Sequence, residues 1–359
     1  MTREEIGDKR NTDEESDERD KEENTDADRE ELTYAGAGVD INASEAATAA
    51  LVDAASGPGG ANGESQGNDT GEYAGLIDLG GTYLGLATDG VGTKLLVAEA
   101  LGEYSTIGID CIAMNVNDLV AAGITPVAFV DYLAVAEPDE AVAAAVGEGL
   151  SAGAEEAEIE LVGGETAVMP EVVRNLDLAG TCAGFATEEE LFPGEAAVGN
   201  ALVGFRSSGI HSNGLTLARQ AVTREHDYTD SFPDDPGSSI GDVLLKPTRI
   251  YTHLLSPLRE HGTHAAAHVT GGGWGNLSRM GNYRYAIDEA FDPQPVFAFV
   301  QNQGSVSDEE MYSTFNMGTG FVVTLPPEDA EALCAETEGQ VIGRVEEGSG
   351  VAVGGVVIE

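Results

Sequence analysis

The motif TDGVGTK, which ends at Lys94, carries residue types that suit a magnesium-bound nucleotide. Asp89 follows a predicted strand and offers a carboxylate to a hard cation. Gly90 and Gly92 let backbone N–H groups approach a phosphate closely, while Thr93 and Lys94 add a hydroxyl and an ammonium group. We interpret this motif as a phosphate and metal site. A tight turn with a surface Asp and Lys is the structural alternative.

A second group of polar residues lies on a predicted helix, 107–122. Asp110, Met114, Asn117 and Asp118 are spaced i, i+4, i+7 and i+8, so they share one helical face. Two carboxylates and an amide oxygen on one stripe are suitable ligands for Mg²⁺. We therefore expect these polar residues to contact a metal–nucleotide complex. The alternative is an amphipathic helix with a solvated polar face.

Glu165 is a third candidate, because it directly follows a predicted strand, 158–162, and a pair of glycines. Ligands of α/β sheets collect at the carboxyl ends of strands, so we expect Glu165 to contact the nucleotide. An acidic residue at a helix start, favoured by the helix dipole, is the alternative.

The motif SSGIHSNG precedes a predicted helix, 214–226. Small residues at a helix start leave backbone N–H groups free to bind an anion. We expect Ser212 and Asn213 to contact phosphate and His211 to act as a general acid; a capping loop with an incidental histidine is the alternative. A second glycine turn of the same kind comprises Gly271, Gly272 and Gly273.

Helical and strand patterns alternate along the chain, which predicts a mixed α/β (α+β) fold. We expect two domains, 32–186 and 187–359, after an acidic tail, 1–31, whose composition predicts disorder. The expected helices are 44–55, 107–122, 138–152, 214–226, 248–261 and 327–336. The expected strands are 82–88, 127–135, 158–162, 176–186, 201–205, 265–269, 285–287, 320–325, 341–345 and 351–358.

The charge balance is strongly acidic, with 64 Asp and Glu against 17 Lys and Arg and a net charge of −47. Such a surface repels nucleic acid, because duplex binding depends on Lys and Arg contacts to phosphates. It favours an organism with a saline cytoplasm, since 1 M salt reduces the screening length to about 3 Å. Only Lys94 and Lys246 are lysines beyond the tail, and both lie in motifs punctuated by Gly or Pro.

Other classes of protein are excluded by what the chain lacks. No segment reaches the roughly 20 consecutive apolar residues of a membrane helix, and the charged N-terminus is unlike a secretory signal. Cys111, Cys182 and Cys334 are far apart and odd in number, which excludes a disulfide framework and a thiolate zinc cluster. We expect a soluble cytoplasmic protein that binds neither membranes nor nucleic acid.

Taken together, the motifs resemble those of the phosphoribosylformylglycinamidine cyclo-ligase family, the aminoimidazole ribonucleotide synthetases of purine biosynthesis. The resemblance implies a homodimer of two α/β domains, in which the N-terminal domain binds ATP and Mg²⁺ and forms the dimer. It implies ATP-dependent cyclisation of formylglycinamidine ribonucleotide to 5-aminoimidazole ribonucleotide, with release of ADP and phosphate. The motifs that carry it are YAGAGVDI (34–41), TDGVGTK (88–94), STIGIDCIAMNVNDLVAAG (105–123), LVGGETAVMP (161–170), SSGIHSNG (207–214), LKPTRIY (245–251), HVTGGGWGN (268–276) and EMYSTFNMGTG (310–320).

The resemblance also implies roles for individual residues. Asp89, Asp110 and Asp118 would hold magnesium and ATP, and Lys94 would neutralise charge on the transferred phosphoryl group. A further set would lie near the reacting atoms or a phosphate: His211, Ser212, Asn213 and the three glycines 271–273.

One segment departs from the family pattern, and related enzymes remain as alternatives. The family usually has a basic stretch where this chain has 56–81, which contains no Lys or Arg, so other groups must make any nucleotide contacts there. Thiamine-phosphate kinase and selenophosphate synthetase belong to the same superfamily, but no Cys precedes the first glycine loop as the selenium enzyme would require. A non-catalytic nucleotide-binding subunit is the alternative from another class.

Overall fold

The computed structural model describes residues 31–56 and 74–359, and these residues form one compact unit. The predicted disordered tail, apart from Glu31, and most of the segment 56–81 lie outside the described residues. Within the described part of the chain, no helix is long and apolar enough to cross a bilayer.

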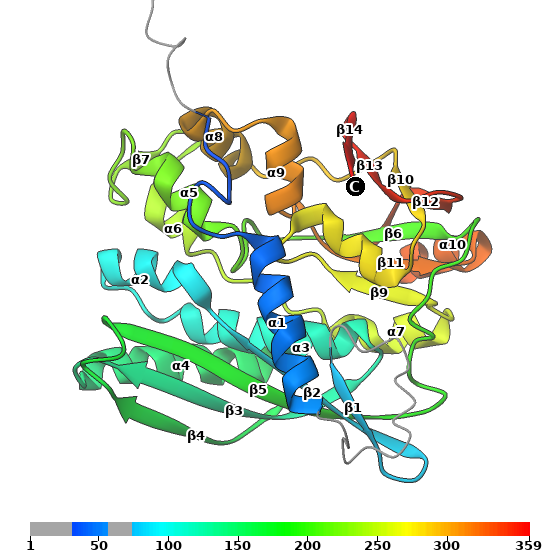
Figure 1. Cartoon of the computed structure of the whole chain (residues 1–359), viewed down its shortest axis with the longest axis horizontal. Coiled ribbons are helices and arrows are strands. Elements are labelled where there is room, and N and C mark those ends of the chain that lie inside the picture. Colours follow the sequence, from blue (N-terminus) through cyan, green and yellow to red (C-terminus); the bar gives the residue numbers. More distant parts are fainter. Residues whose placement is uncertain (1–30, 57–73) are drawn as a thin grey trace, which may run out of the picture. The chain divides into compact units, whose positions relative to one another are not determined.

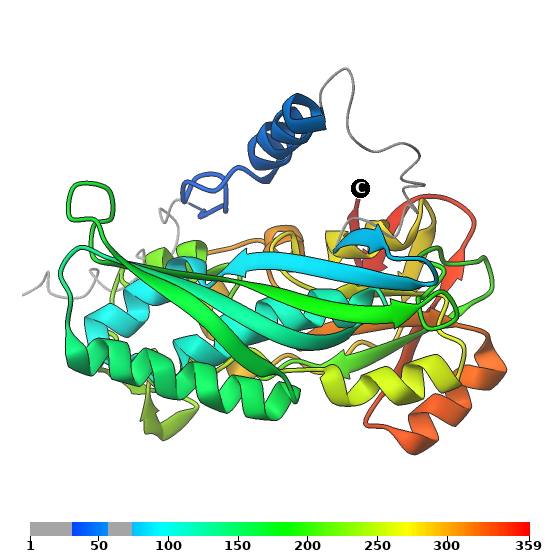
Figure 2. The same ribbon diagram turned by 90° about the horizontal axis from the view of Figure 1, so that it is seen from below.

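The first half of the chain builds a five-stranded sheet in the order β1-β2-β5-β3-β4. Only β3 and β4 run parallel; the other neighbours are antiparallel. The helix α3 packs on β2 and β5, α4 packs on α3 and β4, and both helices lie on one side of the sheet (Figure 2). The strands are β1 (Gly75–Asp78), β2 (Thr82–Gly90), β3 (Thr125–Val135), β4 (Glu160–Val168) and β5 (Leu176–Thr187), and the helices are α3 (Ile107–Ala121) and α4 (Glu140–Ala157).

Alternation along β3 shows how this sheet is covered. Phe129 and Leu133 point towards the helices and are buried, whereas Val130 and Tyr132 point the other way and are 41% and 44% exposed. The outer face is apolar but uncovered by any described residue. Its exposed apolar side chains include Leu86, Val130, Tyr132 and Phe185.

The second half of the chain builds a seven-stranded sheet in the order β14-β13-β10-β12-β6-β11-β9 (Figure 1). The central strands β6 and β11 are almost entirely buried, as their apolar sequences require. The strands are β6 (Ala201–Arg206), β9 (Ala265–His268), β10 (Arg284–Ile287), β11 (Thr319–Leu325), β12 (Gln340–Glu346), β13 (Gly350–Val353) and β14 (Val356–Ile358). Around it lie α5 (Leu215–Val222), α7 (Leu255–Glu260), α8 (Pro295–Gly304), α9 (Asp308–Thr314), α10 (Pro327–Glu336) and the 3-10 helices η2 (Thr252–Leu254) and η3 (Gly273–Met280).

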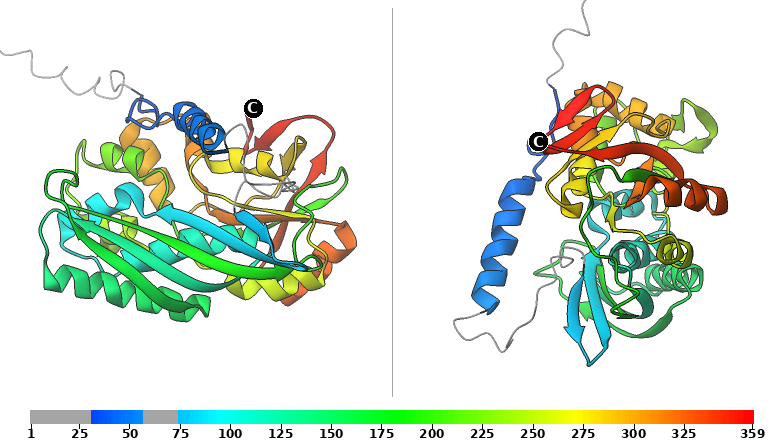
Figure 3. Two further views of the ribbon diagram at one scale, coloured as in Figure 1. Left: turned by 60° about the horizontal axis from the view of Figure 1, so that its bottom comes forward. Right: turned by 90° about the vertical axis from the view of Figure 1, so that its right-hand side faces the viewer.

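Smaller elements complete the fold. The turn after β2 continues through η1 (Gly92–Lys94) into α2 (Leu95–Leu101), and a hairpin of β7 (Ser231–Phe232) and β8 (Asp235–Ser239) leads into α6 (Ile240–Leu244). The N-terminal helix α1 (Ile41–Ser56) stands away from the two sheets (Figure 3), and most of its described side chains are exposed.

Most expected elements are confirmed, and two differences matter for function. The predicted helix 248–261 begins only at Thr252, because backbone N–H groups of the preceding residues bond to side chains from elsewhere in the chain. The predicted strand 158–162 starts later and continues through the glycine pair as β4. A Cβ on Gly164 would lie 2.2 Å from Oδ1 of Asp131, so any other residue here would have to displace the Asp131 carboxylate.

Candidate nucleotide and metal site

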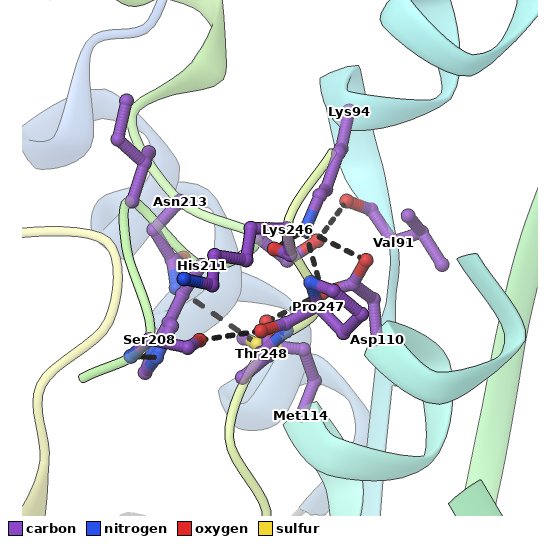
Figure 4. A network of polar contacts seen from close by, with 12 residues as sticks. Val91, Lys94, Asp110, Met114, Ser208, His211, Asn213, Lys246, Pro247 and Thr248 are labelled. Atoms are coloured by element: carbon purple, nitrogen blue, oxygen red, sulfur yellow. Dashed lines mark hydrogen bonds and ion pairs between the residues drawn. The ribbon is translucent and has the colours of Figure 1, made fainter. Parts of the chain in front are cut away.

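Lys94 and Asp110 form a fully buried ion pair where the two halves of the chain meet (Figure 4). The Lys94 ammonium donates to Oδ1 of Asp110 at 2.9 Å and to the carbonyl oxygen of Lys246 at 2.6 Å. The same Oδ1 accepts from the N–H and the hydroxyl of Thr248, at 2.7 and 2.6 Å. Burial lowers the pKa of Lys94, and the adjacent Asp110 carboxylate opposes this effect.

These contacts change the expectation for both residues. Neither side chain has exposed surface through which phosphate or metal could reach it. Lys94 is a counter-charge inside the protein, not a surface cation, and Asp110 holds the segment that follows Lys246. The solvated-face alternative for the helix is also wrong, because Asp110 and Asn117 are completely buried.

His211 is buried in a left-handed backbone conformation, with φ of 66°. Its Nε2 accepts from the backbone N–H groups of Ser208 at 3.0 Å and Arg249 at 3.4 Å, so the proton of the neutral ring lies on Nδ1. Burial, together with the neighbouring His268 ring and the positive charges of Lys94 and Arg249, holds the pKa of His211 well below its usual range. This departs from the expected general acid, because a neutral ring lacks the second, acidic proton that a charged imidazolium would donate at neutral pH.

Asn117 is turned into the protein. Its Oδ1 accepts from the N–H of Tyr251 at 2.9 Å, and its Nδ2 donates to the carbonyl oxygen of Arg249 at 2.9 Å. The expected contact of Asn117 with nucleotide is therefore replaced by a contact with the 249–251 backbone. Three residues predicted as ligands (Lys94, Asp110 and Asn117) thus hold one loop from the second half of the chain.

Asp89 and Asp118 are the expected metal ligands that remain accessible, since Asp89 is exposed and the side chain of Asp118 is partly exposed. Partial enclosure by protein raises the pKa of Asp89, and the negative charge of Asp118 raises it further, while His268 and Arg279 oppose this. The side chain of Asp118 is 19% exposed and bonds to Nδ1 of His268 at 3.0 Å. Two carboxylates that repel each other favour a cation between them.

The donor set fits Mg²⁺ bound together with a phosphate. No group of three or more His, Cys, Asp or Glu side chains arranged to hold a metal occurs in the described part of the chain. Mg²⁺ is commonly bound by one or two carboxylates, with phosphate oxygens and waters as its remaining ligands. Asp89 and Asp118 supply the two carboxylates, whereas Asp110 does not join them.

The glycine loops lie beside this pair of carboxylates. A Cβ on Gly271 would be 3.5 Å from Oδ1 of Asn213, so the turn 271–273 and the loop 211–214 lie side by side. Ser212 donates to the carbonyl oxygen of Val91 at 2.8 Å, which joins the second loop to the TDGVGTK motif. The loops of the two halves are therefore assembled into one region, as the motifs predict.

Comparison of the sequence with known families matches both halves of the chain to one family. Residues 71–186 match the family described as AIR synthase related protein, N-terminal domain, and residues 197–355 match its C-terminal domain. The phosphoribosylformylglycinamidine cyclo-ligase of Methanosarcina acetivorans is 45% identical over 330 residues, which cover 91% of this chain and 98% of that protein. The chain belongs to the phosphoribosylformylglycinamidine cyclo-ligase family. The predicted resemblance is confirmed.

A second archaeal relative is similar to the same degree, and solved structures share the fold. The cyclo-ligase of Pyrococcus furiosus is 46% identical over 307 residues, covering 84% of this chain and 90% of that protein. Thiamine-monophosphate kinase from Stenotrophomonas maltophilia shares the fold with a TM-score of 0.58 at 22% identity, covering 77% of this chain and 87% of that one. Hydrogenase maturation protein HypE in complex with ATP gives 0.55 at 20% identity, covering 79% and 86%.

Within this member of the cyclo-ligase family, Glu165 is not brought to the two carboxylates. In the sheet register Asp89, Gly180, Asp131 and Gly164 occupy one row, and Glu165 pairs with Tyr132 in the next. Side chains of adjacent rows point to opposite faces, so Glu165 lies on the uncovered face of the sheet.

The structure also shows site residues that the motifs did not single out. His268 and Arg279 lie close enough to Asp89 to lower its pKa. His268 ends β9 directly before the glycine turn, and Arg279 lies on η3 directly after it. Their positions on either side of the turn 271–273 are the sequence signal that could have identified them.

Proposed function

We propose that the chain closes the imidazole ring of 5-aminoimidazole ribonucleotide, using ATP and formylglycinamidine ribonucleotide as substrates. Membership of the cyclo-ligase family, at 45% identity over nearly the whole chain, carries this proposal. The site supports it, because Asp89 and Asp118 are accessible and the neighbouring motifs contain glycines that allow close approach to phosphate. ADP and phosphate are the other products.

The reaction needs ATP because an amide oxygen is a poor leaving group. The formamide oxygen receives the terminal phosphoryl group, the amidine nitrogen attacks the activated carbon, and phosphate leaves. Asp89 and Asp118 would hold Mg²⁺, which supplies charge neutralisation for the phosphates when bound. Arg279 adds a positive charge beside them. Ser212 and Asn213 shape the adjoining loop, and His211 keeps that loop in place.

The electrostatic problem explains why these groups matter. A protein with a net charge of −47 repels a triphosphate unless the potential is inverted locally. The cation bound by Asp89 and Asp118, together with Arg279 and backbone N–H groups, would provide that inversion. Nucleotide binding is therefore expected to depend on Mg²⁺.

A homodimer is part of the proposal. The uncovered face of the five-stranded sheet carries Val130, Tyr132 and Phe185, each more than 40% exposed. A contiguous apolar sheet face of this kind is typical of an interface. A second copy packed on it would also cover Glu165, which is how that residue could reach a nucleotide in the assembly. A cytoplasmic location stays a prediction.

The activity is tested with purified protein in high salt, formylglycinamidine ribonucleotide, ATP and Mg²⁺. We expect 5-aminoimidazole ribonucleotide, measured as a diazotisable amine, together with stoichiometric ADP. Absence of product over a range of salt concentrations, with circular dichroism showing folded protein, would contradict the proposal.

The metal site is tested separately with Asp89→Asn and Asp118→Asn. Each removes a negative charge at the cation but little packing, so we expect at least a tenfold loss of magnesium-dependent ATP affinity by calorimetry. The unfolding midpoint should stay close to wild type. Large losses of stability in both variants would indicate a structural role instead.

A further inference from the structure

The orientation of the Asn117 amide is determined by two backbone groups. Its Oδ1 lies 2.9 Å from the N–H of Tyr251, which can only donate, and its Nδ2 lies 2.9 Å from the carbonyl oxygen of Arg249, which can only accept. A flipped amide would place N–H against N–H and oxygen against oxygen. Because Asn117 is fully buried, water cannot compensate for such a mismatch.

The amide in turn determines which nitrogen of His268 carries the proton. Nδ2 of Asn117 also lies 3.3 Å from Nε2 of His268, and since Nδ2 is a donor, Nε2 must be an acceptor. The proton of the neutral ring therefore lies on Nδ1. Nδ1 is 3.0 Å from Oδ1 of Asp118, so it donates to that carboxylate. His268 is fully buried, which leaves the ring few alternative orientations.

This chain of hydrogen bonds holds Asp118 by one oxygen only. No hydrogen bond from another described residue reaches its second oxygen, and the side chain is 19% exposed. The negative charge of Asp118 acts on Asp89 across the same space. A carboxylate that is held by one oxygen and is partly exposed can offer its other oxygen to a cation.

We infer that Asn117 and His268 are positioning residues, which fix Asp118 in the orientation that binds Mg²⁺ jointly with Asp89. The inference rests on the proposed function, since it concerns the magnesium site of that reaction. It reassigns Asn117 from nucleotide ligand to support, and it gives His268 a role that needs no change of protonation. The Tyr251 backbone fixes the orientation of the Asn117 amide, the amide fixes the tautomer of His268, and His268 fixes the Asp118 carboxylate.

The first test is the tautomer of His268. With ¹⁵N-labelled histidine, the side-chain resonances of the six histidines can be resolved, and the His268 signal assigned by its loss in His268→Gln. We expect the wild-type ring to be protonated at Nδ1 and bare at Nε2. A ring protonated at Nε2 alone would overturn the inference, because Asp118 would then face a nitrogen without a proton.

The second test uses two amides that imitate opposite sides of the ring. His268→Asn keeps an N–H near the position of Nδ1, whereas His268→Gln places its amide near the position of Nε2. We expect His268→Gln to raise the Mg²⁺ concentration needed for ATP binding, measured by calorimetry, about tenfold or more, and His268→Asn to retain most of the wild-type affinity. Equal losses in both variants would mean that the ring only fills space.

His264, which directly precedes β9, provides a matched control. His264 bonds through Nδ1 to Asn200 at 2.9 Å and lies outside the site, so His264→Gln should leave the Mg²⁺ dependence unchanged. Thermal unfolding of all three variants checks their folding. If wild-type protein binds ATP equally well with and without Mg²⁺, both the proposed function and this inference are contradicted. Magnesium-dependent wild-type binding that His268→Gln leaves unaltered would contradict the inference alone.

Discussion

Burial decides whether a charged residue of this protein can contact a ligand, and Lys94 and Asp110 are the clearest example. Both occur in motifs that resemble nucleotide sites, yet each is completely buried and bonded to the other. A buried pair of this kind contributes little net stability, but removing one partner leaves the other charge without compensation. We therefore propose that Asp89 and Asp118, not Lys94 and Asp110, contact the magnesium-bound nucleotide.

The first prediction at this scale concerns Asp110→Asn. The change leaves the Lys94 ammonium buried without its carboxylate and weakens the contacts to Thr248. We expect a loss of about 3–5 kcal/mol in the free energy of unfolding, measured by denaturant titration in high salt. Asp89→Asn is the control, because it removes an accessible carboxylate and should cost far less. Similar losses in the two variants would contradict the prediction.

A second prediction concerns pH and His211. In the folded protein burial keeps the pKa of His211 well below 6.5, whereas in the unfolded chain it returns to about that value. Below pH 6.5 the unfolded state therefore binds a proton that the folded state does not, and stability falls as pH falls, by up to about 1.4 kcal/mol per pH unit. His211→Asn should reduce this slope between pH 6.5 and 5. An unchanged slope would show that other groups cause it.

Among the elements, β4 and the 248–251 segment show what the sequence could and could not predict. The family, the two α/β sheets and most element positions follow from motifs and periodicity. The spacing of Asp110, Asn117 and Asp118 correctly predicted that they lie on one helix. It could not predict which segment covers that helix. The covering segment comes from more than 130 residues away. The partnership of His268 with Asp118 spans 150 residues and has no local signal.

The prediction for β4 compares its two glycines. A Cβ on Gly164 would lie 2.2 Å from the Asp131 carboxylate, whereas one on Gly163 meets only a methyl group of Val130 at 4.0 Å. We expect Gly164→Ala to destabilise the protein by about 1–3 kcal/mol and Gly163→Ala to have little effect. Thermal and denaturant unfolding would measure both. Equal effects would mean that β4 is not tightly fitted at this position.

For the whole molecule, the open face of the first sheet predicts association. Val130→Glu places a charge at the centre of the apolar face, and we expect it to convert a dimer into monomers, as measured by light scattering during gel filtration in high salt. Val357→Glu is the control, because Val357 is also exposed, at 54%, but lies on the second sheet. A wild-type monomer, or a Val130→Glu dimer, would contradict the proposed interface.

The segment 248–251 also constrains how such a protein can be rearranged. The backbone N–H groups of Thr248, Arg249 and Tyr251 donate to Asp110, His211 and Asn117, respectively. Side chains from both halves of the chain therefore fix the backbone conformation of this segment. A chimaera that joined the first half to the second half of a remote homologue would have to preserve the backbone conformation of 248–251 and these hydrogen bonds. Recombination is therefore expected to succeed only among close relatives, and separately expressed fragments should regain activity only when the fragment containing 248–251 docks in its native register.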